Sequence, residues 1–432
     1  MGEANPPARG AAGRTGTVLA AALAAALAWT PGAHAADPSG GGRGAVPFAQ
    51  AWGDNEDGQL GTGDNADSAV PVPVPEPNGI SSLAAGFEHS LALLKDGTVW
   101  AWGDNDNGQL GNGTETDSSV PVRVLGLTGV KAVAAGDDFS LALLRDGTVR
   151  AWGDNDNGQL GNGTLADSTL PVQVQMLSGV KALAGGDNHA VVLLRGGAVR
   201  AWGDNDNGQL GNGTLADSTI PVEVQGITRA RAVAAGGDHS LAVVRDGRVR
   251  AWGDNFSGQL GNGTNIDSTT PVEVQALTGV KTVAAGLGHS LALGGDGTVW
   301  SWGDNASGQL GNGTTADSTI PVQVQGLRGV TAISTAEEHN LALTSSCDCG
   351  DAGLASRLSC RCGGPVGPVG TGEDDPGDEP EGAGSVVHAW GENGEGQLGN
   401  GATADSSVPV AVTTVSARAG LIAAGGEHSL AG

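Results

Sequence analysis

The chain has 432 residues, and its 21 lysines and arginines face 47 aspartates and glutamates, which gives a formal net charge of -26 at pH 7. This acidic balance disfavours nucleic acid and anionic membrane surfaces as partners, because both attract basic faces. The 76 glycines together with recurrent tryptophans favour many tight turns in an all-β chain over a helical one.

Residues 1–35 have the features of an export signal. Two arginines precede an alanine-rich apolar run from Val18 to Trp29, and the small residues of Ala33–His34–Ala35 follow it. The run is shorter than the ~20 apolar residues that a bilayer span requires, and it lacks the polar face of an amphipathic helix, which is the alternative interpretation. We therefore expect a secreted, extracellular protein with no membrane insertion, in which residues 36–44 form a short linker.

A Trp-Gly pair returns with a fixed period of 50 residues through the rest of the chain. Such a period is typical of a closed or stacked array of one supersecondary unit. In-phase repetition favours tryptophans that wedge between units over tryptophans that stack on carbohydrate. Residues 45–432 are thus predicted to form one domain. The recurring tryptophans are Trp52, Trp102, Trp152, Trp202, Trp252, Trp302 and, after an insertion, Trp390.

The repeat between Gly129 and Ser178 predicts four antiparallel strands. Asp146–Gly147 predicts a tight hairpin turn in which both central residues have positive φ. Gly158–Gly163 is too rich in glycine for a strand and is expected to form an ordered loop. Seven four-stranded units of this kind predict an all-β, seven-bladed β-propeller. The predicted strands cover Lys131–Ala135, Ser140–Leu144, Val149–Gly153 and Pro171–Val174.

The chain starts and finishes in the middle of a repeat. Val46–Trp52 matches the third strand of the unit, and His428–Gly432 matches the second. We expect these two strands to pair and to close the last blade, which would remove the exposed sheet edges. A solenoid is disfavoured because neither end has the polar outer face of a capping repeat.

An insertion at residues 345–384 contains all four cysteines and a run rich in glycine, proline and acid. In an exported chain this clustered set predicts two disulfides with three possible connectivities, and a four-thiolate zinc site is the alternative. The insertion replaces a tight turn, so we expect it to project from one face, as a tolerated surface insertion or as a partner-binding segment. The cysteines are Cys347, Cys349, Cys360 and Cys362.

Two recurrent segments, Ala-Trp-Gly-Asp-Asn-x-x-Gly-Gln-Leu-Gly-Asn-Gly and Ala-Ala-Gly-x-x-His-Ser-Leu-Ala-Leu, resemble the regulator of chromosome condensation repeat. The resemblance extends over the mature chain apart from the insertion and implies a seven-bladed propeller. The eukaryotic namesake promotes guanine nucleotide exchange on a small GTPase and binds chromatin, which an exported acidic chain does not match. A secreted bacterial relative of propeller form inhibits β-lactamases, and this is an alternative function for the chain.

The histidines also recur in phase, and Phe139 takes the place of one of them. Equivalent atoms of adjacent blades lie roughly 10 Å apart, too far to share a zinc ion at ~2 Å, so we expect each imidazole to bond a neighbouring backbone, with surface recognition as the alternative. Asp104 and Asp106 suggest a calcium loop, but that frame would place Gly103 and Thr114 at ligand positions, so an Asx turn is favoured. Each acid, base or nucleophile recurs in most blades, so we expect no catalytic residue, no metal and no cofactor. The histidines are His89, His189, His239, His289, His339 and His428.

The two residues before the histidine position vary between repeats. A fixed scaffold that displays varied loop tips is how repeat proteins form binding surfaces, although neutral variation of exposed tips is the alternative. We predict a non-enzymatic protein-binding propeller whose acidic ring favours a partner with a basic surface. A propeller enzyme acting on cell-wall glycan and a purely structural envelope protein are the other classes. The candidate residues are Phe87, Glu88, Asp137, Asp138, Phe139, Asp187, Asn188, Asp238, Leu287, Glu337, Glu338 and Glu427.

Overall fold

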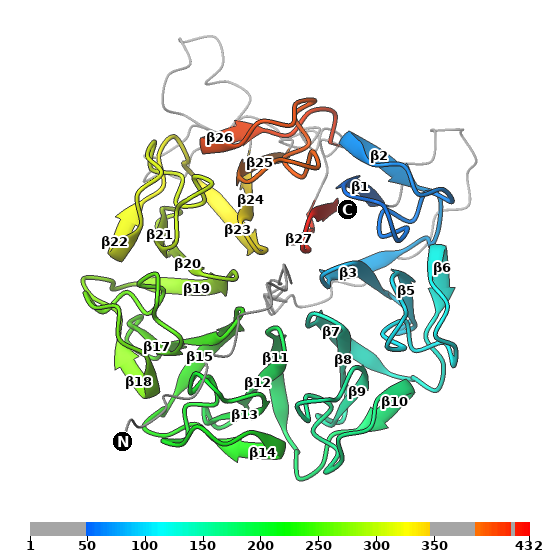
Figure 1. Cartoon of the computed structure of the whole chain (residues 1–432), viewed down its shortest axis with the longest axis horizontal. Coiled ribbons are helices and arrows are strands. Elements are labelled where there is room, and N and C mark those ends of the chain that lie inside the picture. Colours follow the sequence, from blue (N-terminus) through cyan, green and yellow to red (C-terminus); the bar gives the residue numbers. More distant parts are fainter. Residues whose placement is uncertain (1–48, 346–384, 416–419) are drawn as a thin grey trace, which may run out of the picture.

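The computed structural model describes residues 49–345, 385–415 and 420–432. Within them, seven four-stranded antiparallel sheets surround a central axis as the blades of a propeller (Figure 1). The predicted fold class is therefore confirmed. The predicted export signal, the linker and the four cysteines lie outside the described residues. No helix in the described part of the chain is long and apolar enough to span a bilayer.

The strands have the same lengths and spacing in almost every blade. The first two complete blades contain β3 (Ile80–Ala85), β4 (His89–Leu94), β5 (Val99–Gly103) and β6 (Ser118–Arg123), then β7 (Val130–Ala135), β8 (Phe139–Leu144), β9 (Val149–Gly153) and β10 (Ser168–Gln173). The next two contain β11 (Val180–Gly185), β12 (His189–Leu194), β13 (Val199–Gly203) and β14 (Ser218–Glu223), then β15 (Ala230–Ala235), β16 (His239–Val244), β17 (Val249–Gly253) and β18 (Ser268–Glu273). The following two contain β19 (Val280–Ala285), β20 (His289–Gly294), β21 (Val299–Gly303) and β22 (Ser318–Gln323), then β23 (Val330–Thr335), β24 (His339–Ser345), β25 (Ser385–Gly391) and β26 (Ser406–Ala411). The remaining blade combines β1 (Ala49–Gly53) and β2 (Ser68–Val74) with β27 (Ile422–Ala424) and β28 (His428–Ala431).

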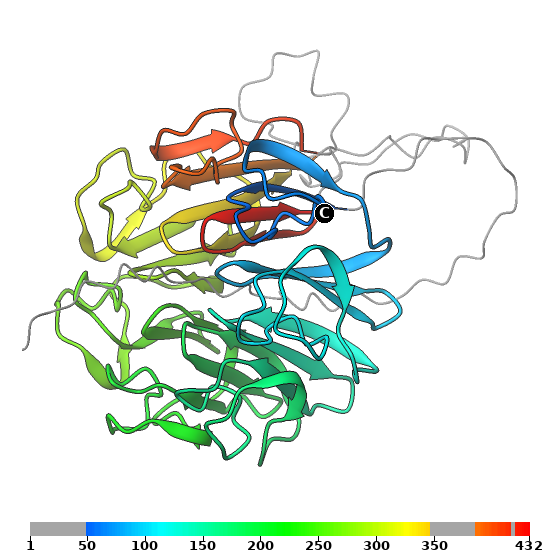
Figure 2. The ribbon, with the colours of Figure 1, turned by 45° about the vertical axis from the view of Figure 1, so that its right-hand side comes forward.

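Apart from the blade that contains both ends of the described chain, the strands of a blade follow one another from the axis outward in sequence order. The first strand of a blade lies next to the axis and the fourth forms the outer rim, as in the order β3-β4-β5-β6 (Figure 1). An oblique view shows neighbouring sheets packed face to face around this axis (Figure 2). The outer strands begin with a Ser-x-x-Pro pattern, and a proline suits this edge because no partner strand needs its missing N–H.

The ring closes through the two ends of the described chain. Strand β1 pairs with β28 in antiparallel register, with Gln50 opposite Ala431 and Trp52 opposite Ser429. The resulting sheet has the order β2-β1-β28-β27, so one blade is assembled from residues almost the whole chain length apart. This confirms the predicted closure.

The hairpin turn differs from the prediction. Leu144 N–H donates to Thr148 O at 2.9 Å, and Gly147 N–H donates to Leu144 O at 3.0 Å, so three residues form the loop. Gly147 has a positive φ of 86°, whereas Asp146 is not among the residues with positive φ. The expectation that both Asp146 and Gly147 adopt positive φ is therefore wrong. A three-residue loop needs one left-handed residue after its turn, and glycine supplies it.

Tryptophan side chains fill the spaces between blades. All seven in-phase indoles are fully buried. The Nε1–H of Trp152, for example, donates at 2.8 Å to Gln109 O in the preceding blade. Gly111 lies against the same indole, and a Cβ on Gly111 would come within 2.7 Å of Trp152 Nε1. Each indole thus joins two blades, and the facing glycine leaves the room for it.

Candidate functional site

The charges divide the disc into two faces. One face carries the turns between the first two strands of each blade and the loops between the last two strands, and we call it the acidic face. The turns are residues 86–88, 136–138, 186–188, 236–238, 286–288, 336–338 and 425–427. The loops are residues 54–67, 104–117, 154–167, 204–217, 254–267, 304–317 and 392–405. None of these segments contains a lysine or an arginine. All lysines and arginines among the described residues lie on strands or turns toward the opposite face, which we call the cationic face.

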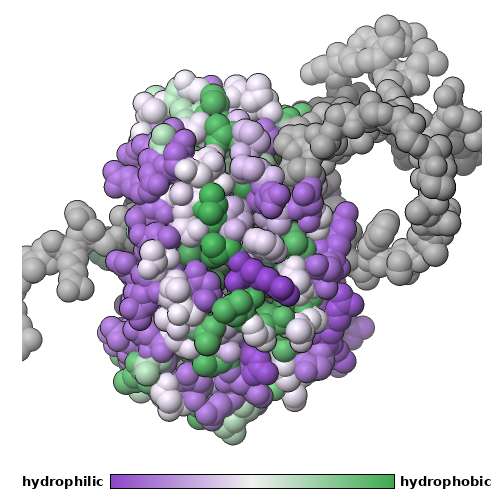
Figure 3. Space-filling model, turned by 90° about the vertical axis from the view of Figure 1, so that its right-hand side faces the viewer, coloured by the Kyte–Doolittle hydropathy of each residue, from purple (hydrophilic) through white to green (hydrophobic). Residues whose placement is uncertain are grey.

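The flank between the two faces is less polar. Seen from the side, hydrophilic side chains gather toward both faces, and hydrophobic ones appear mainly in the belt between them (Figure 3). Exposed apolar residues on the outer strands, such as Val120 on β6 and Leu170 on β10, belong to this belt. The two faces are therefore the surfaces with the most distinct chemistry.

Backbone hydrogen bonds join successive inner turns of the acidic face around the axis, from the turn 425–427 through 86–88 to 336–338. Phe87 N–H donates to Asp137 O at 3.3 Å, and Asp137 N–H donates to Asp187 O at 3.3 Å. Leu287 N–H donates to Glu337 O at 3.3 Å in the same way. These bonds fix the first variable position of each turn, so the predicted candidates Phe87, Asp137, Asp187, Leu287 and Glu337 lie around one axial opening.

Three carboxyl groups converge at this opening. Glu337 is only 2% exposed and Asp187 only 5%, while Asp137 is half-buried. Burial raises the pKa of Glu337 to about 11, and the nearby Glu427, Asp137 and Asp187 raise it further. Burial also raises the pKa of Asp137, with Asp138 as the next cause. The buried Glu337 Oε1 and Asp137 Oδ1 have no hydrogen-bond partner among the described residues, and the described turns and loops of this face contain no lysine or arginine.

The second variable position contacts the preceding blade in several of the turns. Gln109 Nε2 donates to Asp138 Oδ1 at 3.1 Å, and Gln209 Nε2 donates to Asp238 Oδ1 at 2.9 Å. Asn188 accepts the equivalent bond from Gln159 Nε2 at 3.1 Å. These half-buried residues therefore join blades as well as facing solvent.

Glu88, Glu338 and Glu427 occupy the same second position on other blades, and all three are half-buried. Burial raises the pKa of Glu88 to about 8, with Asp57 and Asp104 as further causes. Ser307 Oγ donates to Glu338 Oε2 at 2.5 Å. The second positions thus extend the acidic surface outward from the axial opening.

Phe139 requires a correction, because it does not belong to this surface. It is the first residue of β8 rather than a turn residue, and its side chain is fully buried. Its ring packs over Gly136, where an added Cβ would come within 1.9 Å of Phe139 Cε1. A side chain enclosed in this way is not available to a partner.

The in-phase histidines bridge adjacent blades. His189 Nε2 lies 2.9 Å from Ser240 Oγ in the next blade, and Ser240 Oγ donates to Gln209 O at 2.9 Å. Because the serine proton is used in that bond, the imidazole donates its Nε2–H to the serine. Burial lowers the pKa of His189 to about 3, so the ring is neutral. The Nε2 partner is therefore a side chain that in turn bonds the backbone, which the sequence did not indicate, while a backbone hydrogen bond with Gly237 also acts on the pKa of His189.

Phe139 and Ala190 show the apolar version of this bridge. Ala190 occupies the position that holds serine in most blades, 51 residues after Phe139. Both residues are fully buried in one hydrophobic cluster. Where the histidine is absent its serine partner is absent too, which leaves no hydroxyl unpaired. The spacing of 51 residues between a histidine and its serine partner was not predicted, although the sequence shows that Phe139 and Ala190 depart from the repeat together.

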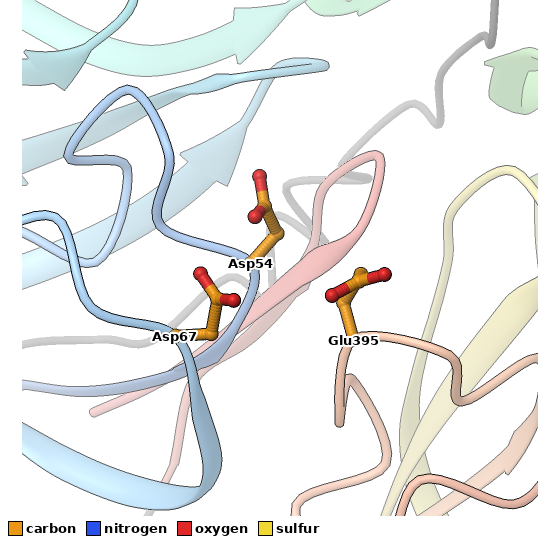
Figure 4. A group of neighbouring side chains, drawn as sticks. All are labelled: Asp54, Asp67 and Glu395. Carbon is orange, nitrogen blue, oxygen red and sulfur yellow. The ribbon is translucent and has the colours of Figure 1, made fainter.

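The acidic loops contain carboxylates close enough to suggest cation sites. Asp54, Asp67 and Glu395 bring ligand atoms within 4.8 Å of one another (Figure 4). Asp67 Oδ1, however, accepts Asn55 N–H at 2.9 Å, and Asp54 Oδ1 accepts Glu56 N–H at 3.4 Å. The bond from Glu56 N–H has the spacing of the expected Asx turn, whereas the bond from Asn55 N–H closes the loop across twelve residues.

Comparison with known proteins gives the family. Residues 49–381 match the RCC1-like domain, and residues 386–431 match the regulator of chromosome condensation (RCC1) repeat. The chain belongs to the RCC1-like domain family. The RCC1-like propeller is similar to Prp20p from Saccharomyces cerevisiae, with a TM-score of 0.72 and 23% identity over 89% of this chain and 90% of that one. It is also similar to human WBSCR16, with a TM-score of 0.71 and 25% identity over 89% of this chain and 98% of that one.

A curated relative matches over a short stretch. The ultraviolet-B receptor UVR8 of Arabidopsis thaliana is 45% identical over 53 residues, which are 12% of this chain and 12% of that protein. The aligned part is thus a small fraction of either protein and corresponds in length to about one repeat.

Proposed function

We propose that this RCC1-like propeller is a secreted, non-enzymatic protein that binds a basic segment of a partner protein on its acidic face. The observation that carries the proposal is the axial opening, where Asp137, Asp187 and Glu337 converge on a face whose described turns and loops have no lysine or arginine. A lysine or arginine side chain of a partner would bring a positive charge to this opening, where it would lower the pKa of the carboxyl groups and form charge-assisted hydrogen bonds with them.

Other features support the same proposal. Prp20p is described with binding properties to Gsp1p and histones, so a propeller of this fold serves as a protein-binding scaffold in that case. The N-terminal sequence supports secretion, because residues 1–35 have the pattern of an export signal. The non-enzymatic role is supported by the histidine–serine pairs, which are fully buried and repeated as inter-blade bridges.

A peptide-binding measurement tests the site. A fluorescent peptide of alternating lysine and glycine is titrated with the protein and with a variant that carries D137N, D187N and E337Q, and anisotropy is recorded at about 0.1 M salt. These amides keep the shape of the side chains and remove the acids. We expect the variant to bind at least about tenfold more weakly, which corresponds to 1.4 kcal/mol.

A control variant separates this site from the net charge. Asp96, Asp146 and Asp296 lie in hairpin turns of the cationic face, where each accepts bonds from a nearby threonine. The variant with D96N, D146N and D296N removes the same number of carboxyl groups and so changes the formal net charge equally. It should bind the peptide within about twofold of the unmodified protein, because charges beyond the Debye length of about 10 Å are screened. Equal losses in both variants would refute the proposed site.

A further inference from the structure

The cationic face carries lysines and arginines at two positions that recur near the axis. One is the second residue of the innermost strand, and the other is the first residue of the hairpin turn between the second and third strands. We call the residues at these positions the cationic crescent, because they lie on consecutive blades and leave the remaining blades without such residues. They are Lys95, Lys131, Arg145, Lys181, Arg195, Arg231, Arg245 and Lys281.

Backbone hydrogen bonds place the two sets side by side. Val180 N–H donates to Gly147 O at 3.1 Å, so the turn that begins at Arg145 contacts the start of the next inner strand, which carries Lys181. Ala230 N–H donates to Gly197 O at 2.9 Å, and Val280 N–H donates to Gly247 O at 3.0 Å. The crescent is therefore continuous from blade to blade.

The ion pairs on this face involve other arginines. Arg200 pairs with Glu223 at 3.4 Å and Arg250 with Glu273 at 3.0 Å on the two outer strands, and Arg248 pairs with Asp246 at 3.2 Å within one hairpin turn. No crescent residue forms an ion pair in the part of the chain that the structure describes. Lys131 has its pKa lowered by burial and then by Arg195 and Lys181, so cations lie close together here. Such a group of like charges, in a chain of net charge -26, is an anion-binding surface.

The long insertion starts from a position equivalent to the crescent turns. Ser345 N–H donates to Gly329 O at 3.4 Å, as Arg145 N–H donates to Gly129 O at 2.9 Å in another blade. Ser345 and Ser385 are paired at the ends of β24 and β25, so both ends of residues 346–384 are attached to the cationic face.

The insertion contains the most acidic stretch of the chain, residues 373–381, which is Glu-Asp-Asp-Pro-Gly-Asp-Glu-Pro-Glu. The stretch starts twelve positions before Ser385, and an extended chain of that length reaches about 40 Å. The four strands of a blade at about 4.8 Å spacing span roughly a third of that. The acidic stretch is thus within reach of the crescent.

We propose that the cationic crescent is a binding site for an acidic polypeptide segment, and that its occupant is the stretch 373–381 of this same chain. Attachment of the stretch to the same face gives it a high effective concentration, and six carboxylates complement the clustered cations. The proposal concerns the face opposite the acidic one, so its failure would leave the proposed function untouched.

Carbodiimide cross-linking tests this directly, because it joins only a lysine amine and a carboxylate that are already in contact. The full-length chain, mixed from normal and 15N-labelled preparations, is cross-linked at low salt and mapped by mass spectrometry. We expect cross-links from Lys131, Lys181 or Lys281 to residues 373–381, with both ends carrying the same isotope. Their yield should fall at least about tenfold at 1 M salt, where the Debye length is 3 Å.

A charge-neutralised variant serves as the comparison. It carries E373Q, D374N, D375N, D378N, E379Q and E381Q, and it should lose the cross-links of the three lysines. A control with D106N, D156N and D206N, which are exposed acids of the other face, should retain them. Cross-links that join different isotopes would show that the occupant is a second copy. That result, or an absence of cross-links to residues 373–381, would overturn the proposal.

Discussion

The bridge between His189 and Ser240 can be tested with a double-mutant cycle. Its double variant, with phenylalanine and alanine at these positions, has the same residue pair that another blade carries natively. Replacing Ser240 with alanine leaves the Nε2–H of His189 buried without an acceptor, which costs about 1–3 kcal/mol. Replacing His189 with phenylalanine leaves Ser240 Oγ bonded to Gln209 O but sets a ring edge against a hydroxyl, at a cost of about 1 kcal/mol. The double variant reproduces the pair Phe139 and Ala190, both fully buried in the native protein. We expect it to be more stable than the sum of the single changes by about 1–2 kcal/mol.

The assay is urea unfolding followed by tryptophan fluorescence, with the free energy of unfolding compared among the four proteins. The pH dependence gives a second check. The pKa of His189 is lowered to about 3, below its ordinary value of about 6.5. Above pH 6.5 the imidazole is neutral in both the folded and the unfolded chain, so its protonation does not change the free energy of unfolding there. As the pH falls from there toward 3, the unfolded chain binds a proton that the folded chain does not, and stability falls by about 1.4 kcal/mol per pH unit. The phenylalanine variant should lack this part of the acid sensitivity. Additive changes within about 0.5 kcal/mol, with an unaltered pH slope, would refute the role of the bridge.

Three further predictions concern the tryptophan spacing and the axial acids. Gly111→Ala should lower the free energy of unfolding by about 2–5 kcal/mol, because its Cβ would press on Trp152. Gly126→Ala, with a similar positive φ but open space around it, should cost only about 1 kcal/mol in the same urea assay; equal losses would contradict the steric argument. Glu337→Gln should raise the free energy of unfolding at pH 7 by about 3 kcal/mol. Because the pKa of Glu337 is raised to about 11, its protonated form stabilises the fold fully below pH 4.5, and this contribution is lost as the pH rises toward 11. An unchanged pH dependence of unfolding in the variant would be inconsistent with that burial. Binding of the lysine peptide at pH 7 should release protons, because a nearby cation lowers the pKa of the axial carboxyl groups. Calorimetry in buffers of different ionisation enthalpy measures the number of protons released. A binding enthalpy that does not depend on the buffer would argue against the axial acids as the site.

The periodic features of the sequence determined most of the architecture. The tryptophans recur in phase with Trp52 because the same indole fills the space between every two blades. The two chain ends match the third and the second strand of the repeat, which predicted the pairing of β1 with β28. Local turn geometry was less accessible, since an Asp-Gly pair is compatible with loops of two or three residues. The inter-blade bridge could not be seen within one repeat, because its two residues belong to different blades. Phe139 was assigned to the surface because it varies, yet it varies together with Ala190 inside the core.

The variation of the turn residues predicted that these turns form one surface. It did not predict which of the two variable residues in each turn lies next to the axis, and this determines how acidic the axial opening is. Only the structure shows that Asp137, Asp187 and Glu337 share one opening. It also separates the first position of each turn, which forms the ring, from the second, which bonds the preceding blade. A single sequence does not distinguish these two roles, because both positions vary and both carry acids.

Hydrogen–deuterium exchange of the peptide complex tests the central claim most directly. The inner turns of the acidic face, such as 136–138 and 336–338, should exchange more slowly when the lysine peptide is bound, while the hairpin turns 145–148 and 195–198 of the opposite face keep their rates. Slowed exchange in the hairpin turns with unchanged rates in the inner turns would contradict the assignment of the acidic face as the partner-binding surface.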